Sequence, residues 1–175
     1  MPQSALIGAT ICVLPLLLMI AYHDVRYRRI PNPYVLAVLI YGIGYHVIFG
    51  GLSGTLASLE GVALAFGLMF VLHIFGAMGA GDVKLFGAIG SVIGVKLVLP
   101  TFVAVVLTGG LLALGFAIFS GTLRTTMWRV LNILFGLMPG ARLPRYEIPV
   151  DRSLTIPYGV AITLGTLTSF VLYRG

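Results

Sequence analysis

Two acidic residues of this chain are placed where they could act as a pair. Asp24 follows one long apolar segment, and Asp82 precedes another, in the stretch "GAMGAGDVKLFG" at residues 76–87. Two carboxyl groups held close together share one proton, because both cannot ionise comfortably at short range. The ionised member can take a proton from water while the protonated member polarises a peptide carbonyl. The residue types therefore suggest aspartic proteolysis.

The residues around Asp82 allow a second interpretation. Gly79 and Gly81 lack side chains, so an extended substrate backbone could approach the carboxylate closely. Asp82 could instead form a structural ion pair with Lys84 or with an arginine at a membrane surface. An ionisable residue within a membrane span is a functional candidate by default, but both aspartates lie at segment ends, which weakens that argument. Both interpretations remain open at this point.

The elements that position these aspartates are expected to be membrane-spanning helices. Hydrophobic residues make up 59% of the 175 residues and charged residues 9%, and the mean hydropathy is +1.07. A soluble domain has about 25% charged residues. The composition thus predicts an all-α integral membrane protein with a single polytopic domain over residues 1–175. The single cysteine, Cys12, excludes a disulfide framework.

Six apolar segments approach or reach the length of about 20 residues that a span requires. They are expected at residues 4–22, 34–49, 56–76, 83–95, 97–119 and 154–173. Asn32 and Pro33 resemble a helix N-cap followed by proline at the first helical position. "GGLSGT", residues 50–55, is expected to form an uncharged turn, and residues 120–153 a loop rich in arginine.

The basic residues predict the orientation. With the N-terminus outside, nine of the 11 lysines and arginines fall on the cytoplasmic side, and only Lys96 and Arg174 fall outside. Two crossings separate Asp24 from Asp82, so both carboxylates are expected at the cytoplasmic face. The positive charge is explained by orientation and by contact with anionic lipids, and no nucleic-acid partner is expected.

Three motifs resemble the type IV prepilin peptidase family, whose members are GxGD-type intramembrane aspartyl proteases. They are "GAGDVK" after an apolar span, "RRIPN" shortly after Asp24, and "IPYGVAI" at residues 156–162. The motifs occur in the family's order. The resemblance implies catalytic roles for Asp24 and Asp82. It also implies that neighbouring residues shape the site, namely Gly79, Gly81, Lys84, Pro157, Tyr158 and Gly159.

The resemblance further implies an inner-membrane endopeptidase that removes leader peptides from single-span prepilins, with cleavage just after a glycine. Longer family members carry a cytoplasmic domain with cysteine pairs, associated with metal binding and N-methylation. This sequence is similar to the short form associated with tight-adherence (Flp) pili, so methyltransferase activity is not expected. No metal or cofactor is expected either, since no cluster has metal-ligand spacing.

Two other classes of function are compatible with the sequence. One is a small proton-coupled transporter or channel subunit using the aspartates as a relay, and the other is a non-catalytic subunit of a pilus machine. Glu60 and His73 are minor candidates for proton or substrate handling, and His23 could tune the pKa of Asp24. Helix packing explains Gly90 and Gly94 better than a site does.

Overall fold

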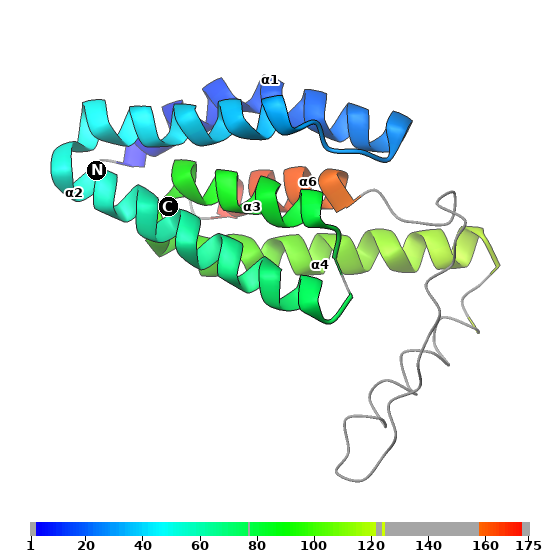
Figure 1. Ribbon diagram of the computed structural model, residues 1–175. Coiled ribbons are helices and arrows are strands. Elements are labelled where there is room, and N and C mark those ends of the chain that lie inside the picture. Colours follow the sequence, from blue (N-terminus) through cyan, green and yellow to red (C-terminus); the bar gives the residue numbers. More distant parts are fainter. Residues whose placement is uncertain (1–2, 77, 122–123, 125–157, 173–175) are drawn as a thin grey trace, which may run out of the picture. The chain divides into compact units, whose positions relative to one another are not determined.

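All regular secondary structure in the described part of the chain is helical. The computed structural model describes residues 3–76, 78–121, 124 and 158–172, and no strand occurs among them. Figure 1 shows the five helices, which are α1 (Gln3–Tyr27), α2 (Asn32–Ile74), α3 (Ala80–Ile93), α4 (Val95–Phe119) and α6 (Tyr158–Leu172). Two of the helices described, α2 and α4, are long and apolar enough to cross a membrane, judged by length and composition alone.

The chain divides into two compact units. One comprises residues 1–109 and 157–175, and the other comprises residues 110–156. Asp24, Asp82 and Gly159 all belong to the first unit, so the candidate site can be described within it. The loop expected at residues 120–153, with Glu147 and most of its arginines, lies almost wholly outside the described residues.

Helix α2 is a hairpin of two arms joined at Gly51. Gly51 has φ 56° and ψ −149°, whereas the residues on both sides keep helical hydrogen bonding, and Figure 1 shows the chain reversing there. Only glycine adopts such a backbone without strain. The expected turn over residues 50–55 was therefore too long. The hydroxyl groups of Ser53 and Thr55 donate to the carbonyls of Gly50 and Gly51, and helical structure resumes immediately.

The first arm of α2, residues 32–50, begins one residue earlier than the sequence suggested. Pro31 occupies the cap position with an extended backbone, and its carbonyl accepts bonds from the N–H groups of Tyr34 and Val35. Asn32 is thus the first helical residue rather than the N-cap, and its side chain makes no capping hydrogen bond. The expectation for Asn32 and Pro33 was wrong by one position.

Helix α3 lies between the two arms of α2 and is the most buried helix. Every residue from Leu85 to Ile93 is buried. Glycines permit the close approach: a Cβ on Gly90 would meet the backbone of Gly61 in the second arm, and one on Gly42 in the first arm would meet Ser91. Gly90 therefore serves helix packing, as expected, while Gly94 ends α3 with φ 68°.

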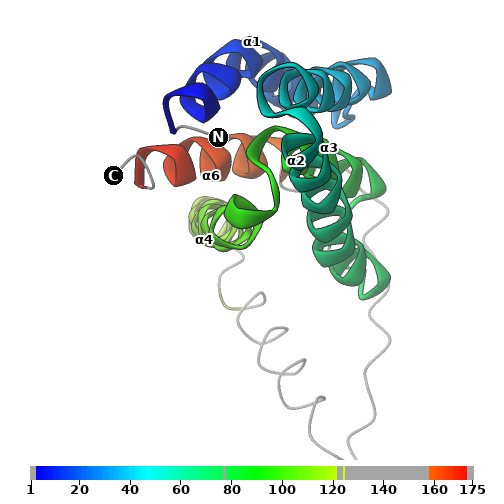
Figure 2. The same ribbon diagram turned by 90° about the vertical axis from the view of Figure 1, so that its left-hand side faces the viewer.

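Hydrogen bonds from buried polar side chains connect the helices. His46 Nε2 donates to the carbonyl of Val92, and Ser58 Oγ donates to that of Ser91, at the end of α3 away from Asp82. Thr101 Oγ1 and Ser169 Oγ share a 2.8 Å hydrogen bond between α4 and α6. Helix α6 also packs on α1, and both can be followed in Figure 2. These contacts hold α6 where its first turn can reach the end of α1.

Candidate active site

Asp24 is held at the end of α1 by the beginning of α6. Its side chain is only 7% exposed. The carboxylate oxygen Oδ2 accepts a hydrogen bond of 2.7 Å from the backbone N–H of Gly159. That N–H belongs to the first turn of α6, whose partial positive charge also favours a carboxylate. Asp24 is thus fixed by a segment 135 residues away in the sequence.

The close approach of Asp24 explains why position 159 is a glycine. A Cβ there would stand 2.9 Å from Oδ2 of Asp24 and 3.1 Å from its Cβ, both closer than ordinary contacts. Any side chain would push α6 away from α1. The glycine of the "PYG" segment therefore allows the N–H to reach the carboxylate. Pro157 lies outside the described residues, and Tyr158 is the first residue of α6.

Asp82 is held at the beginning of α3. It is the third residue of the helix and 8% exposed. Its Oδ2 accepts a 3.1 Å hydrogen bond from the backbone N–H of Gly79, the residue that caps α3. A carboxylate suits this position, because it satisfies an N–H group without a helical partner and complements the helix dipole.

The glycines beside Asp82 have different environments. A Cβ on Gly79 would lie 2.9 Å from Oδ2 of Asp82, so this glycine leaves room for the carboxylate. A Cβ on Gly81 would lie 3.3 Å from the Cβ of Ile30. Gly81 therefore lets the first turn of α3 rest against the "RRIPN" connection after Asp24. Ile30 was not singled out in the sequence, yet it is the residue of this connection that lies against Gly81.

The structure brings the two carboxylates within electrostatic range of each other. Both flank the expected apolar spans rather than lying inside them. Burial and, to a smaller extent, the charge of Asp24 raise the pKa of Asp82 to about 6, against the opposing effect of the N–H of Gly79. Burial also raises the pKa of Asp24, but the N–H of Gly159 and the charge of Arg28 lower it. Asp82 is therefore the member of the pair that keeps a proton more readily.

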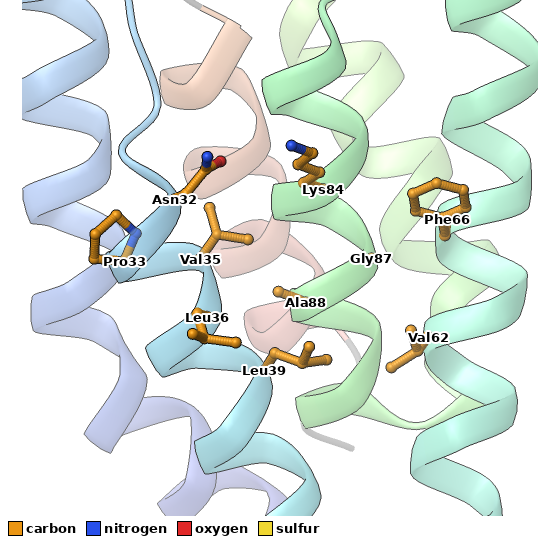
Figure 3. Close-up of a pocket in the computed structure, with 10 residues that line it drawn as sticks. All are labelled: Asn32, Pro33, Val35, Leu36, Leu39, Val62, Phe66, Lys84, Gly87 and Ala88. Carbon is orange, nitrogen blue, oxygen red and sulfur yellow. The ribbon is translucent and has the colours of Figure 1, made fainter.

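Lys84 does not join this pair. It is exposed, and no ion pair connects it to Asp82 within the part of the chain described. The described residues therefore include no contact that would support a structural ion pair between Asp82 and Lys84. Lys84 instead lies beside Asn32 at the end of a separate groove, shown in Figure 3.

The two histidines that the sequence singled out have packing partners. The Nδ1 of His73 lies 2.8 Å from the carbonyl of Met78. Because a carbonyl only accepts, Nδ1 must carry the hydrogen. His73 thus ties the end of α2 to the loop preceding Gly79, a link that its spacing of five residues could have suggested. The ring of His23 lies among those of Tyr22, Tyr27 and Tyr34, and Glu60 is exposed.

Comparison with known proteins identifies the class to which this arrangement belongs. The sequence model of the type IV leader peptidase family matches residues 11–114, more than half of the chain. The chain therefore belongs to the type IV leader peptidase family, as its motifs suggested.

One curated relative adds detail. Over 98 residues the chain is 35% identical to a prepilin leader peptidase/N-methyltransferase of Bacillus subtilis (strain 168). The match covers 55% of this chain and 39% of the relative, so the chain spans well under half of that protein's length in the comparison. No solved structure matches.

Proposed function

We propose that this protein is a membrane-embedded aspartyl endopeptidase that removes leader peptides from prepilins. One observation carries the proposal: two buried carboxylates, from helices distant in the sequence, are each held by a backbone N–H and lie within range of each other's charge. Membership of the type IV leader peptidase family and the name of the Bacillus relative support the substrate class.

The two aspartates take different roles in the proposed reaction. Asp24 takes the ionised role: burial raises its pKa, but the N–H of Gly159 and the charge of Arg28 favour its anion. Asp82 carries the shared proton, because burial and the Asp24 charge disfavour its anion. Asp24 takes a proton from water as the water oxygen bonds to the scissile carbonyl carbon, and Asp82 donates its proton to the carbonyl oxygen. The tetrahedral intermediate then collapses: Asp24 gives the proton that it took from water to the leaving nitrogen, the C–N bond breaks, and the proton on the former carbonyl oxygen returns to Asp82.

The substrate proposed is a single-span precursor with an apolar helix next to the leader. Its junction would lie at the cytoplasmic face, between the end of α1 and the beginnings of α3 and α6. Flp-type prepilins are the substrate class that we propose. Gly79 and Gly81 would shape the site by leaving room for the Asp82 carboxylate and for Ile30. Tyr158 and Gly159 would bound it from α6.

Asparagine variants test the catalytic pair. Asp24→Asn and Asp82→Asn should each abolish cleavage of a candidate prepilin, measured by sequencing the N-terminus of the product, because asparagine cannot exchange the shared proton. The double variant should be scarcely worse than either single variant, since the two act as one unit. The exposed Glu60→Gln is the control and should retain activity. Cleavage by either asparagine variant would contradict the aspartyl mechanism, whereas a native chain that cleaves no prepilin would favour a transporter, channel or assembly role.

The proposed location is the inner membrane, crossed six times with the N-terminus outside. Single cysteines introduced into a variant lacking Cys12 should label residues 26 and 80 from the cytoplasmic side and residue 51 from the outside. Labelling residues 26 and 80 from opposite sides would contradict a shared site.

A further inference from the structure

An open apolar groove runs along α3 between the two arms of α2. Its volume is about 550 Å³. Gly87 and Ala88 of α3 form its floor, and Figure 3 shows them between the two walls. The first arm contributes Val35, Leu36 and Leu39, and the second contributes Val62 and Phe66. Leu36 and Phe66 are 54% and 42% exposed, so the walls are open to the surroundings.

This groove is separate from the candidate active site. Successive residues of an α-helix are spaced at about 100° around its axis. The directions of Lys84 and Asp82 therefore differ by about 160°, and those of Gly87 and Asp82 by about 140°. Asp82 faces the charge of Asp24 on α1, whereas Lys84 and Gly87 line the groove on the other side of α3. A precursor helix lying in this groove would have α3 between itself and the carboxylate pair.

The groove has a polar group at one end only. Lys84 and Asn32 lie together at that end in Figure 3, and the other lining residues are apolar. The N-termini of α2 and α3 begin at this end, and helix N-termini carry partial positive charge. Lysine in the first turns of a helix opposes the dipole. None of the described residues that line the groove is acidic, so the Lys84 ammonium has no carboxylate partner within the groove. This end of the groove is therefore its positively charged end.

We propose that the groove binds one anionic phospholipid. The phosphate of the head group would lie against the Lys84 ammonium and the Asn32 amide, and an acyl chain would lie over Gly87 and Ala88 between the two arms. Charge complementarity selects an anion at one end, and the apolar floor and walls select a hydrocarbon chain along the rest. Basic pockets between membrane helices bind anionic lipid head groups in this manner.

Lipid titrations of the full chain test the proposal. The purified protein in detergent is titrated with phosphatidylglycerol or with phosphatidylcholine of the same acyl chains, and bound lipids are counted by native mass spectrometry. Phosphatidylglycerol should bind more tightly. Lys84→Gln should weaken its binding about fivefold, as expected for one lysine near a membrane surface. Lys84→Arg should retain binding, and Ala88→Leu should reduce binding of both lipids because it fills the floor.

Lys96→Gln is the matched control. Lys96 is also exposed but lies just beyond the other end of α3, away from the groove, so its loss should leave phosphatidylglycerol binding unchanged. Thermal unfolding verifies that each variant is folded. Unchanged phosphatidylglycerol binding by folded Lys84→Gln, or equal binding of the two lipids by the native chain, would refute the anionic site.

Two competitors distinguish other occupants. Inorganic phosphate should not displace phosphatidylglycerol, because it lacks the acyl chain; displacement would indicate a simple anion site. A synthetic peptide with the apolar helix of a prepilin should also leave the lipid bound. If that peptide displaces the lipid from the native chain but binds equally to Lys84→Gln, the groove is a peptide-docking surface and the lipid assignment is wrong.

Discussion

The backbone N–H of Gly159 donates a 2.7 Å hydrogen bond to the carboxylate of Asp24. This bond joins the end of α1 to the beginning of α6 and fixes one half of the candidate catalytic pair. It also favours the anion of Asp24, which is why the proposed mechanism places the shared proton on Asp82.

Replacing this glycine should separate the two helices. In Gly159→Ala, the new Cβ would stand 2.9 Å from Oδ2 of Asp24, so either the carboxylate or α6 must move. A displacement of about 1 Å in a catalytic geometry costs about 100-fold in rate, and we expect a loss of that order in prepilin cleavage. Gly110→Ala is the control, because a Cβ there meets nothing within 4 Å. Equal activity of the two variants would show that the close approach is not needed.

The pH dependence of cleavage should be bell-shaped. Activity requires one ionised and one protonated carboxyl group, so it rises as the pair loses its first proton and falls as it loses the second. The second loss should follow the pKa of Asp82, about 6, because burial and the Asp24 charge raise it. Cleavage rates measured from pH 4 to pH 9 should therefore decline on the alkaline side of that value. A rate that stays constant up to pH 9 would contradict proton sharing.

Asp82→Asn should stabilise the fold at neutral pH while abolishing cleavage. A carboxyl group whose pKa is raised from 3.8 to about 6 favours folding below pH 3.8, and this advantage is lost as the pH rises through 6. Asparagine removes this cost and can still accept the hydrogen bond from Gly79. The gain at pH 7.5 should be up to about 3 kcal/mol, seen as a higher Tm than that of the native chain, and it should vanish near pH 4. A lower Tm for the variant at pH 7.5 would indicate that the Asp82 anion stabilises the fold.

His73 should act as a positioning residue for Asp82. Its Nδ1–H holds the carbonyl of Met78 beside Gly79, whose N–H donates to Asp82. His73→Phe should slow cleavage about fivefold, the effect of one hydrogen bond. It should also move the alkaline limb of the pH profile upward, because the bond from Gly79 lowers the pKa of Asp82.

The conservative variant separates positioning from packing. His73→Asn keeps a donor close to the place of Nδ1 and should restore both the rate and the pH profile. A His73→Phe variant with reduced stability but an unchanged pH profile would show that His73 has only a packing role.

The helical class and the grouping of the acidic residues could be predicted from the sequence. Long apolar segments leave few alternatives to helices, and the parity of crossings put Asp24 and Asp82 at one end. The family was recognisable from the motifs "GAGDVK" and "IPYGVAI". The structure explains why one residue of each motif, Gly81 and Gly159, is small.

Other features depend on three-dimensional contacts that no local pattern encodes. The reversal at Gly51 is confined to one residue, although its neighbours Gly50 and Gly54 have the same intrinsic freedom. His46 was not singled out, because its burial arises from Val92 on a helix 46 residues away. The resemblance of "GAGDVK" implied a place for Lys84 at the site, whereas two residues along a helix put it on the other face of α3 from Asp82.

The hydrogen bond between Asp24 and Gly159 also affects the timing of biosynthesis. The two residues are separated by 135 positions, so a ribosome adding about 5–20 residues per second needs roughly 7–27 s to make the second after the first. During that interval the carboxylate of Asp24 lacks the N–H that fixes it. A nascent chain would thus acquire its complete proposed site only after Gly159 has been made, which would limit premature hydrolysis by shorter nascent chains.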